Sequence, residues 1–303
     1  MRGNVLVTGA SGQLGTELRM LHGSLEGCSF FFTDAVAQES GWHWSTAVLD
    51  ITDADAVISF VAQNQIDVIV NCAAYTNVDK AEDDCERADL INNKGVANLA
   101  SAAKQAGAAL IHISTDYVFG GEGNVPYTEQ MQVAPLGVYG VTKLLGENAI
   151  KGVMGEDGDF VILRTAWLYS QYGNNFMKTM LRLTAERENI NVVFDQVGTP
   201  TYAADLAQVI LECIRLDKLQ GIYHFSNEGV CSWYDFALEI AKLSGHDKCK
   251  ISPCHSDEFP SKVKRPSYSV LDKTKIKQAL GIEIPHWKES LERCLERCQE
   301  RFK

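Results

Sequence analysis

The chain has 303 residues, a length that fits one large domain or two smaller ones. Hydrophobic residues make up 46% and charged residues 22%, so the chain can bury a core without disulfides or metal ions. Its formal net charge of −11 argues against extended binding to nucleic acid or to an anionic membrane surface. An acidic protein can still bind a phosphate through backbone N–H groups, so a small anionic ligand is not excluded.

The N-terminus and the cysteines indicate a cytoplasmic protein. The apolar run 5–7 is too short for a signal peptide, and no stretch approaches the roughly 18 apolar residues of a membrane span. The nine cysteines are scattered along the chain in an odd number, which is typical of reduced thiols. Cys294 and Cys298 are four residues apart but lack a second pair of ligands, so we expect no metal site.

Strand and helix patterns alternate through the first half of the chain. Short apolar runs predict strands at 4–8, 29–33, 67–71, 109–114 and 159–164. Amphipathic stretches between them predict helices at 13–22, 53–63, 87–106 and 136–153. This alternation predicts an α/β fold, a Rossmann-like doubly wound parallel sheet with right-handed crossovers and helices on both faces.

The second half of the chain predicts a smaller C-terminal substrate-binding lobe. The expected elements are a helix at 175–188, strands at 190–194 and 221–225, and helices at 203–216, 233–243, 272–280 and 286–302, with a proline-containing loop at 252–269. We assign 1–172, together with 190–225, to a dinucleotide-binding domain. The lobe then comprises 173–189 and 226–303. Periodicity alone leaves open whether Leu291 and Leu295 face the core or an interface.

A glycine-rich turn follows the first predicted strand and opens the first predicted helix. Gly9, Gly12 and Gly15 have the spacing G-x-x-G-x-x-G. Glycine allows a tight turn, a close approach of backbone to a pyrophosphate, and close helix–strand packing, while the helix N-terminus offers free N–H groups. The alternative is an ordinary glycine-rich turn. The predicted cofactor-binding residues of this turn are Gly9, Ser11, Gly12, Gln13 and Leu14.

An acidic residue ends the second predicted strand. Asp34 lies 19 residues after Gly15, where a carboxylate can accept hydrogen bonds from an adenosine ribose diol. A carboxylate there disfavours a 2′-phosphate, so Asp34 favours NADH, although the cofactor remains NADPH or NADH. The alternative is a solvent-exposed loop acid. Asp50 and Ile51 follow the strand-like residues 47–49 and are expected to flank an adenine ring.

Three further residues predict acid–base chemistry. Tyr139 and Lys143 are four residues apart on one helix face, and a lysine ammonium beside a tyrosine lowers the pKa of its hydroxyl. A tyrosine so tuned can donate a proton to a carbonyl that is being reduced. Ser114 and Thr115 end the strand before this helix, where open α/β sheets bind ligands. The alternatives, an exposed tyrosine, a solvated lysine and hydroxyls that complete a turn, become less attractive because all these features occur together.

Several longer segments resemble the dTDP-4-dehydrorhamnose reductase family of the extended short-chain dehydrogenase/reductase superfamily. Among the matching segments, those at 173–181 (GNNFMKTML) and 195–201 (DQVGTPT) are the most specific. The others are 71–82 (NCAAYTNVDKAE), 114–119 (STDYVF), 138–147 (VYGVTKLLGE), 164–169 (RTAWLY), 221–225 (GIYHF) and 265–271 (RPSYSVL). The resemblance covers essentially the whole chain.

This resemblance implies a reaction and a set of site residues. Hydride would pass from a reduced nicotinamide to the C4 ketone of dTDP-4-dehydro-6-deoxy-L-mannose, giving dTDP-L-rhamnose. Thr115 would polarise the ketone oxygen, Tyr139 would donate the proton, and Lys143 would tune Tyr139 and hold the nicotinamide ribose. Further cofactor contacts are expected at Ala73, Ala74 and Tyr75. The expected substrate-binding residues are Thr76, Val78, Tyr117, Trp167, Asn175, Lys178 and Arg265, for which core packing of Trp167 and solvation of Lys178 are the alternatives.

Other functions stay open at this point. A reductase or epimerase of another nucleotide sugar would use the same cofactor chemistry. A non-catalytic NADP-binding regulatory subunit of the methionine adenosyltransferase type shares the fold, but the presence of Thr115, Tyr139 and Lys143 favours an enzyme. Some members of the resembled family are dimers with a magnesium site built from glutamates. Glu17 matches one such position, whereas Ala204 occupies another, so we predict no metal and leave a homodimer possible.

Overall fold

A seven-stranded sheet forms the centre of the molecule in the computed structural model, which describes residues 3–36, 45–216, 219–259 and 261–300. Its strand order is β11-β6-β5-β4-β1-β2-β3, and every neighbouring pair is parallel. The strands are β1 (Asn4–Thr8), β2 (Ser29–Asp34), β3 (Ala47–Val48), β4 (Val68–Asn71), β5 (Ala109–Thr115), β6 (Phe160–Thr165) and β11 (Gly221–His224). The order reverses at β1, which opens a crevice at the carboxyl ends of β1 and β4.

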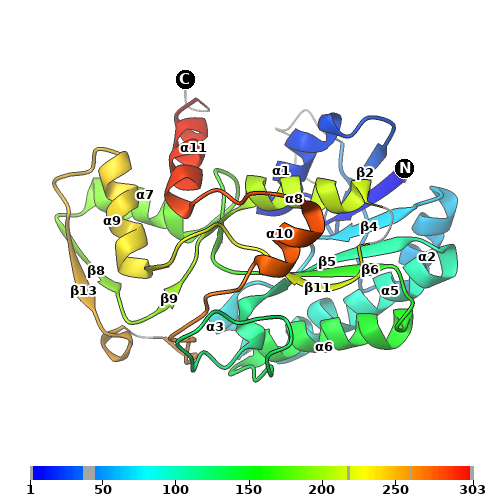
Figure 1. Ribbon diagram of the computed structural model, residues 1–303, viewed down its shortest axis with the longest axis horizontal. Helices are drawn as coiled ribbons and strands as arrows, with labels where there is room; N and C mark the ends of the chain where they lie inside the picture. Colours follow the sequence, from blue (N-terminus) through cyan, green and yellow to red (C-terminus); the bar gives the residue numbers. More distant parts are fainter. Residues whose placement is uncertain (1–2, 37–44, 217–218, 260, 301–303) are drawn as a thin grey trace.

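Helices cover both faces of this sheet (Figure 1). Successive strand side chains point to opposite faces, so Val5 and Val7 enter one core while Leu6 enters another. The first core packs against α1 (Gln13–Leu21), α8 (Ala203–Arg215) and α10 (Thr274–Leu280). The second packs against α2 (Ala54–Gln63), α5 (Gly95–Ala106) and α6 (Val138–Met154). The predicted doubly wound α/β fold is therefore confirmed.

The predicted helix 87–106 is divided in the structure. It begins as α4 (Cys85–Asp89), passes through the π-helical turn η2 (Leu90–Lys94) and continues as α5. The turn carries the buried Asn92, whose side chain accepts from the N–H of Tyr75 and donates to the carbonyl of Tyr75 and the hydroxyl of Thr142. A π-helical turn changes the helix phase. Here the π-helical turn lets the side-chain amide of Asn92 connect the loop after β4 to helix α6.

Short helices occupy the connections around the sheet. They are η1 (His22–Ser24), α3 (Val78–Ala81), η3 (Asp116–Val118) and η4 (Ser256–Glu258). Two of them, α3 and η3, are the next elements after the strands β4 and β5, where ligands bind in open α/β sheets.

A smaller lobe has its own hydrophobic core beside the sheet (Figure 1). Its elements are β7 (Leu168–Tyr169), α7 (Phe176–Glu186), β8 (Asn189–Val193), β9 (Val197–Gly198), β10 (Thr201–Tyr202), β12 (Cys231–Ser232), α9 (Trp233–Leu243), β13 (Lys250–Cys254) and α11 (Trp287–Glu300). Leu291 and Leu295 are buried in its core, which answers the question that periodicity left open.

Two expectations about this half of the chain differ from the structure. The range 190–225 is split between two parts of the structure. Strand β8 pairs with β13 in a separate sheet, whereas α8 packs on the main sheet and β11 is a strand of that sheet. The loop expected at 252–269 begins as strand β13, because residues 250–254 pair in parallel with β8. The last predicted helix ends at Glu300 within the described chain, and residues 301–302 lie outside it.

The described residues contain neither a helix suited to spanning a membrane nor a cluster of metal ligands. None of the helices within these residues has the length and apolar character needed to cross a membrane. Likewise, the described part of the chain contains no group of three or more His, Cys, Asp or Glu side chains that could hold a metal ion.

Candidate active site

A cavity of about 1170 Å³ lies at the carboxyl ends of the central strands. Its lining includes the glycine turn after β1, the ends of β2, β4 and β5, and α6. Trp233 and Arg265 line it from the C-terminal part of the chain. Pockets for small ligands typically have roughly 300–1,000 Å³. This cavity therefore has room for a ligand as large as a dinucleotide with a second ligand beside it.

The glycine turn has the geometry that a dinucleotide requires. Gly9 has φ +62°, and a Cβ there would lie 2.6 Å from the backbone nitrogen of Ala73. A Cβ on Gly15 would lie 2.5 Å from the Cα of Ala10. The helix α1 starts after Gly12 without any side-chain cap, which leaves the N–H groups of its first turn free for phosphate oxygens. The residues present therefore fit a nicotinamide dinucleotide.

Most of the predicted cofactor residues line this cavity. Asp34 does so while its carboxylate accepts hydrogen bonds from the N–H groups of Ser11 (3.0 Å) and Ala35 (2.8 Å). Ser11 and Tyr75 are not part of the lining; the Tyr75 hydroxyl donates to Asp84. The predicted residues that do line it are Gly9, Gly12, Gln13, Leu14, Asp34, Asp50, Ile51, Ala73, Ala74, Tyr139 and Lys143.

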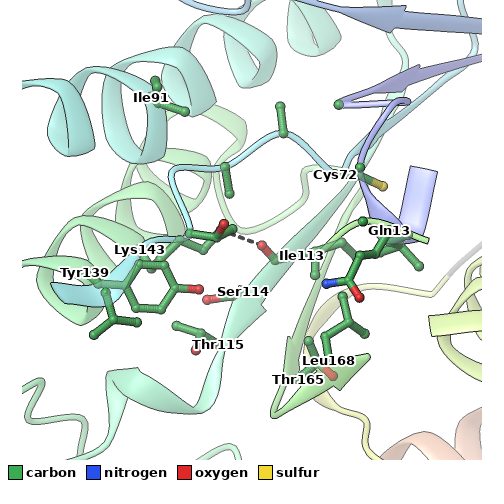
Figure 2. A pocket seen from close by; sticks show the side chains of 18 of the residues that line it. Gln13, Cys72, Ile91, Ile113, Ser114, Thr115, Tyr139, Lys143, Thr165 and Leu168 are labelled. Carbon is green, nitrogen blue, oxygen red and sulfur yellow. Dashed lines mark hydrogen bonds between the residues drawn. The ribbon is translucent and has the colours of Figure 1, made fainter. Parts of the chain in front are cut away.

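Tyr139 and Thr115 meet in the cavity, as Figure 2 shows. The Thr115 hydroxyl donates to Asp116 at 3.0 Å and accepts from the N–H of Tyr117 at 3.1 Å. The pKa of Tyr139 is raised, mainly by burial, although the nearby Thr115 hydroxyl acts in the opposite direction. At neutral pH Tyr139 therefore keeps its proton.

Lys143 points away from the tyrosine hydroxyl. Its Nζ donates to the carbonyl oxygen of Ile113 at 2.6 Å, as the dashed line in Figure 2 shows, and lies 3.3 Å from Nε2 of His112. Burial lowers the pKa of Lys143 to about 8. The net shift of the Tyr139 pKa is upward in this structure and not downward as expected, because burial dominates at the tyrosine and the Lys143 amine is hydrogen-bonded to β5.

The hydroxyls of Ser114 and Thr115 have different hydrogen-bond partners. Its hydroxyl donates to Glu147 at 2.6 Å, and Glu147 accepts two hydrogen bonds from Arg164, at 2.9 and 2.7 Å. All three side chains are buried. Although Ser114 lines the cavity, its hydroxyl is therefore used to join β5, α6 and β6.

Aromatic side chains form one wall of the cavity. The rings of Trp167 and Trp233 are stacked, with centroids 3.5 Å apart and an interplanar angle of 10°. Trp167 has φ +49°, a strained conformation for a non-glycine residue. Tyr117 lies near the guanidinium of Arg265, which donates to Asp79 at 2.9 Å. Of the predicted substrate-binding residues, Thr76, Val78, Tyr117, Trp167, Asn175 and Arg265 line the cavity.

Two predicted substrate-binding residues, Asn175 and Lys178, are hydrogen-bonded to other groups of the protein. The Asn175 side chain caps α7 by accepting from the N–H of Lys178, and its amide donates to Gln13 at 2.8 Å and to the carbonyl of Ser170 at 2.6 Å. Lys178 donates to the carbonyl of Gly173 at 2.8 Å and is not part of the lining.

Trp233, Asp116 and Arg87 are among the lining residues that the sequence analysis missed. Trp233 follows Ser232, the capping residue of α9, and a large aromatic at the start of a predicted helix was the available signal. Asp116 is buried beside Thr115, and burial raises the pKa of its carboxyl to about 6. Its position inside the segment 114–119 could have indicated it. Arg87 also lines the cavity, and no local pattern distinguished it from a solvated helix residue.

The fold and the site together define a class of protein. A parallel sheet, a glycine turn suited to a dinucleotide, and a threonine, tyrosine and lysine at the carboxyl end of the sheet are the features of an oxidoreductase of the extended short-chain dehydrogenase/reductase type. The family model for the RmlD substrate binding domain matches residues 1–300, and the chain belongs to that family.

Known relatives agree with this assignment. A dTDP-4-dehydrorhamnose reductase from Aggregatibacter actinomycetemcomitans is 39% identical over 302 residues, which cover 95% of this chain and 96% of the relative. The crystal structure of a dTDP-4-dehydrorhamnose reductase from Clostridium acetobutylicum matches with a TM-score of 0.89 and 44% identity, over 98% of this chain and 99% of the other. The crystal structure of a dTDP-4-dehydrorhamnose reductase from Bacillus anthracis, in complex with NADP, matches with a TM-score of 0.89 and 39% identity, over 98% of this chain and 100% of the other.

Proposed function

We propose that this chain is an NAD(P)H-dependent oxidoreductase that reduces the C4 ketone of dTDP-4-dehydro-6-deoxy-L-mannose. The product is dTDP-L-rhamnose, and the reaction is the last step of its synthesis. The relatives that match nearly the whole chain support this reaction. The observation that carries the proposal is that Thr115, Tyr139 and Lys143 line one cavity, which the glycine turn also lines.

The cofactor is NADPH or NADH, and its pyrophosphate is bound by the glycine turn. The free N–H groups at the start of α1 bind the phosphate oxygens, and Gly9 lets the turn pack against the backbone of Ala73 because it has no side chain. Asp34 accepts hydrogen bonds from the adenosine ribose. A bound reduced nicotinamide supplies the hydride that the ketone carbon receives.

Proton transfer is assigned to Tyr139. Its raised pKa supports this role, because the hydroxyl holds its proton until the ketone oxygen gains negative charge. Thr115 binds the same oxygen, so the carbonyl is polarised by two hydroxyl groups before it receives the hydride. The proton of Tyr139 passes to that oxygen, which leaves a phenolate to be reprotonated. A positive Lys143 in the same cavity stabilises the phenolate.

The nucleotide sugar is assigned to the aromatic part of the cavity. Trp167 and Trp233 present flat faces suited to a thymine ring and to sugar C–H groups. Arg265 lies beside Tyr117 and is suited to the diphosphate, because a guanidinium binds phosphate oxygens in a bidentate manner. Thr76 and Val78 line the space between these groups and the catalytic residues.

Two further properties belong to the proposal. None of the nine cysteines, all of which lie within the described residues, is in a disulfide, and this supports work in the reducing cytoplasm. Val141 and Leu145 are each 41% exposed and lie four residues apart on α6, which supports a homodimer formed through this helix face. The mass of the protein in solution, measured by light scattering, tests the dimer.

A coupled assay tests the function. The ketone is made in situ from dTDP-glucose by the two upstream enzymes, and loss of NADH or NADPH absorbance is followed after addition of this protein. Oxidation of the cofactor together with appearance of dTDP-L-rhamnose supports the proposal. Absence of oxidation by folded protein that still binds nucleotide leaves another nucleotide-sugar reductase or epimerase, or the non-catalytic binding subunit. A panel of nucleotide-sugar ketones then separates these two.

A further inference from the structure

A chain of buried polar side chains runs beneath the catalytic residues from β1 to α6. The Thr8 hydroxyl donates to the Oδ1 atom of Asn71 at 2.7 Å. The Nδ2 atom of Asn71 lies 3.0 Å from Nδ1 of His112, and Nε2 of the same ring lies 3.3 Å from Nζ of Lys143. All four side chains are at most 2% exposed. The proposed mechanism uses only the last of them.

The backbone determines which way the Asn71 amide is turned. The N–H of Ala73, which can only donate, lies 3.1 Å from Oδ1 of Asn71. The oxygen of the amide must therefore face Ala73 and Thr8, and its NH₂ group must face His112. Because that NH₂ group can only donate, Nδ1 of His112 has to accept, and the neutral ring carries its proton on Nε2.

This tautomer places a donor opposite the amine of Lys143. An ammonium group has three donors and no acceptor, so a charged lysine would meet the Nε2–H of His112 donor to donor. An uncharged amine can donate one hydrogen to the carbonyl of Ile113 and accept the Nε2–H with its lone pair. The geometry of both contacts is thus satisfied by the uncharged form.

We propose that Asn71 holds His112 in its Nε2–H form, and that this ring is a positioning residue that favours the uncharged amine of Lys143. The inference rests on the proposed function, in which the charge of Lys143 supports Tyr139. The charge of the lysine, and with it the pH range of reduction, is then set by residues beneath the cavity that touch neither ligand. The lowered pKa of Lys143, about 8, agrees with this arrangement.

Other groups that face Lys143 act with or against this effect. Glu147, one turn along α6, raises the pKa of the lysine, but its carboxylate is also bonded by Arg164. Cys72, after β4, would raise it as a thiolate, yet burial raises the pKa of this thiol to about 12, so the thiol is neutral at physiological pH. The pKa of His112 is itself lowered by burial and by Lys143, so the ring stays neutral.

The tautomer can be measured in the wild-type protein without turnover. A two-bond ¹H–¹⁵N correlation spectrum of the histidine rings distinguishes Nε2–H from Nδ1–H. A second buried histidine is an internal reference, because Nδ1 of His224 faces the backbone carbonyl of Tyr127 at 2.9 Å and must carry its proton there. At pH 5, where exposed histidines are charged, we expect two neutral rings of opposite tautomer. If both were Nδ1–H, the proposal would be overturned, whatever the substrate of the enzyme.

The effect on Lys143 is tested by His112→Asn. The shorter side chain can still accept from Asn71 but has no donor near the lysine. We expect the high-pH fall of kcat/KM, which in the wild type reports loss of the lysine charge, to move upward by about 1 pH unit. The matched control is His224→Asn, the same change at a buried histidine outside the cavity, for which the pH profile should stay in place.

The two readouts separate this inference from the proposed function. A pH profile of His112→Asn that coincides with the wild type would show that His112 has only a structural role, which contradicts the proposal. If the protein reduces no ketone at all, the proposed reaction is wrong. The tautomer of His112, measured in the wild-type protein, still shows whether this ring faces Lys143 as a donor. If His112→Asn fails to fold, the wild-type spectrum alone decides.

Discussion

Burial shifts the pKa values of Tyr139 and Lys143 in opposite directions. It raises the pKa of the tyrosine and lowers that of the lysine to about 8, so the tyrosine is uncharged at neutral pH, whereas the lysine loses its charge only above about pH 8. A hydroxyl that keeps its proton is the form needed by an acid that acts on a ketone. The i, i+4 spacing brings the two residues to one helix face, and the contacts of each side chain then decide its protonation.

Tyr139→Phe tests the role of the hydroxyl. The ring still packs in the cavity, but no proton can be given to the ketone oxygen, so we expect turnover to fall by roughly 10²–10⁴-fold. The affinity for NADPH, measured by fluorescence titration, should change little. Tyr234→Phe, which removes a hydroxyl outside the cavity lining, is the control. Turnover of Tyr139→Phe close to that of this control would rule out the assigned proton donor.

Asp34→Ala tests the assignment of the ribose. The carboxylate already accepts from two backbone N–H groups, which holds it at the cavity. Its removal eliminates the repulsion of a 2′-phosphate and the bonds to a ribose diol. We expect the ratio of NADH to NADPH efficiency to fall about tenfold, which corresponds to about 1.4 kcal/mol of differential binding. An unchanged ratio in steady-state assays would argue against contact between Asp34 and the ribose.

At the scale of elements, a buried ion pair fixes α6 on the sheet. Glu147 of α6 accepts from Arg164 of β6 and from Ser114 of β5, so one carboxylate connects three elements behind the cavity. The helix that carries Tyr139 and Lys143 is thereby positioned by a contact one turn further along. The π-helical turn η2 adds a second connection, through Asn92 and Thr142.

Glu147→Gln is expected to destabilise the protein by roughly 3–5 kcal/mol, because it leaves the buried guanidinium of Arg164 without a counter-charge. Urea unfolding measures the change. The matched control is Glu186→Gln, which breaks the exposed pair with Arg182 and should cost less than about 1 kcal/mol. Equal effects of the two substitutions would mean that the buried pair does not stabilise the packing of α6.

At the scale of the whole molecule, the main sheet and the smaller lobe form separate cores, and the cavity is lined from both. Loops that cross between distant parts of the chain complete the structure. One such contact lies at the sheet edge, where His224 of β11 is fully buried against Phe119 and the carbonyl of Tyr127. Burial lowers the pKa of His224 to about 3, well below its usual value near 6.5.

This histidine makes stability depend on pH. The ring is neutral in the folded state and can be protonated in the unfolded state, so its contribution is complete above pH 6.5 and is lost progressively as the pH falls toward 3. The destabilisation caused by His224→Asn should therefore be smaller at pH 5 than at pH 7, by about 2 kcal/mol. Urea unfolding of both proteins at the two pH values measures it. A penalty that is the same at both would mean that His224 titrates normally.

Local patterns were sufficient for most of the fold and part of the site. Val68, Ile69 and Val70 predict a strand covered on both faces, and β4 is such a strand. The glycine spacing at Gly9, Gly12 and Gly15 predicts a turn of the correct kind, because each requirement is a property of the backbone at that position. Tyr139 and Lys143 share a helix face because helix geometry is regular.

Tertiary structure decided what these patterns leave open. The sequence by itself determined the alternating elements and the glycine turn, since these depend on spacings of a few residues, and it predicted Thr115, Tyr139 and Lys143 as site residues. It did not determine that Lys143 points to His112 and Ile113, or that Trp233 stacks on Trp167, because the partners lie 30 or more residues away. Pairing of β13 with β8 likewise depends on a distant strand. The protonation states of the site follow from such long-range burial, and only the folded chain establishes them.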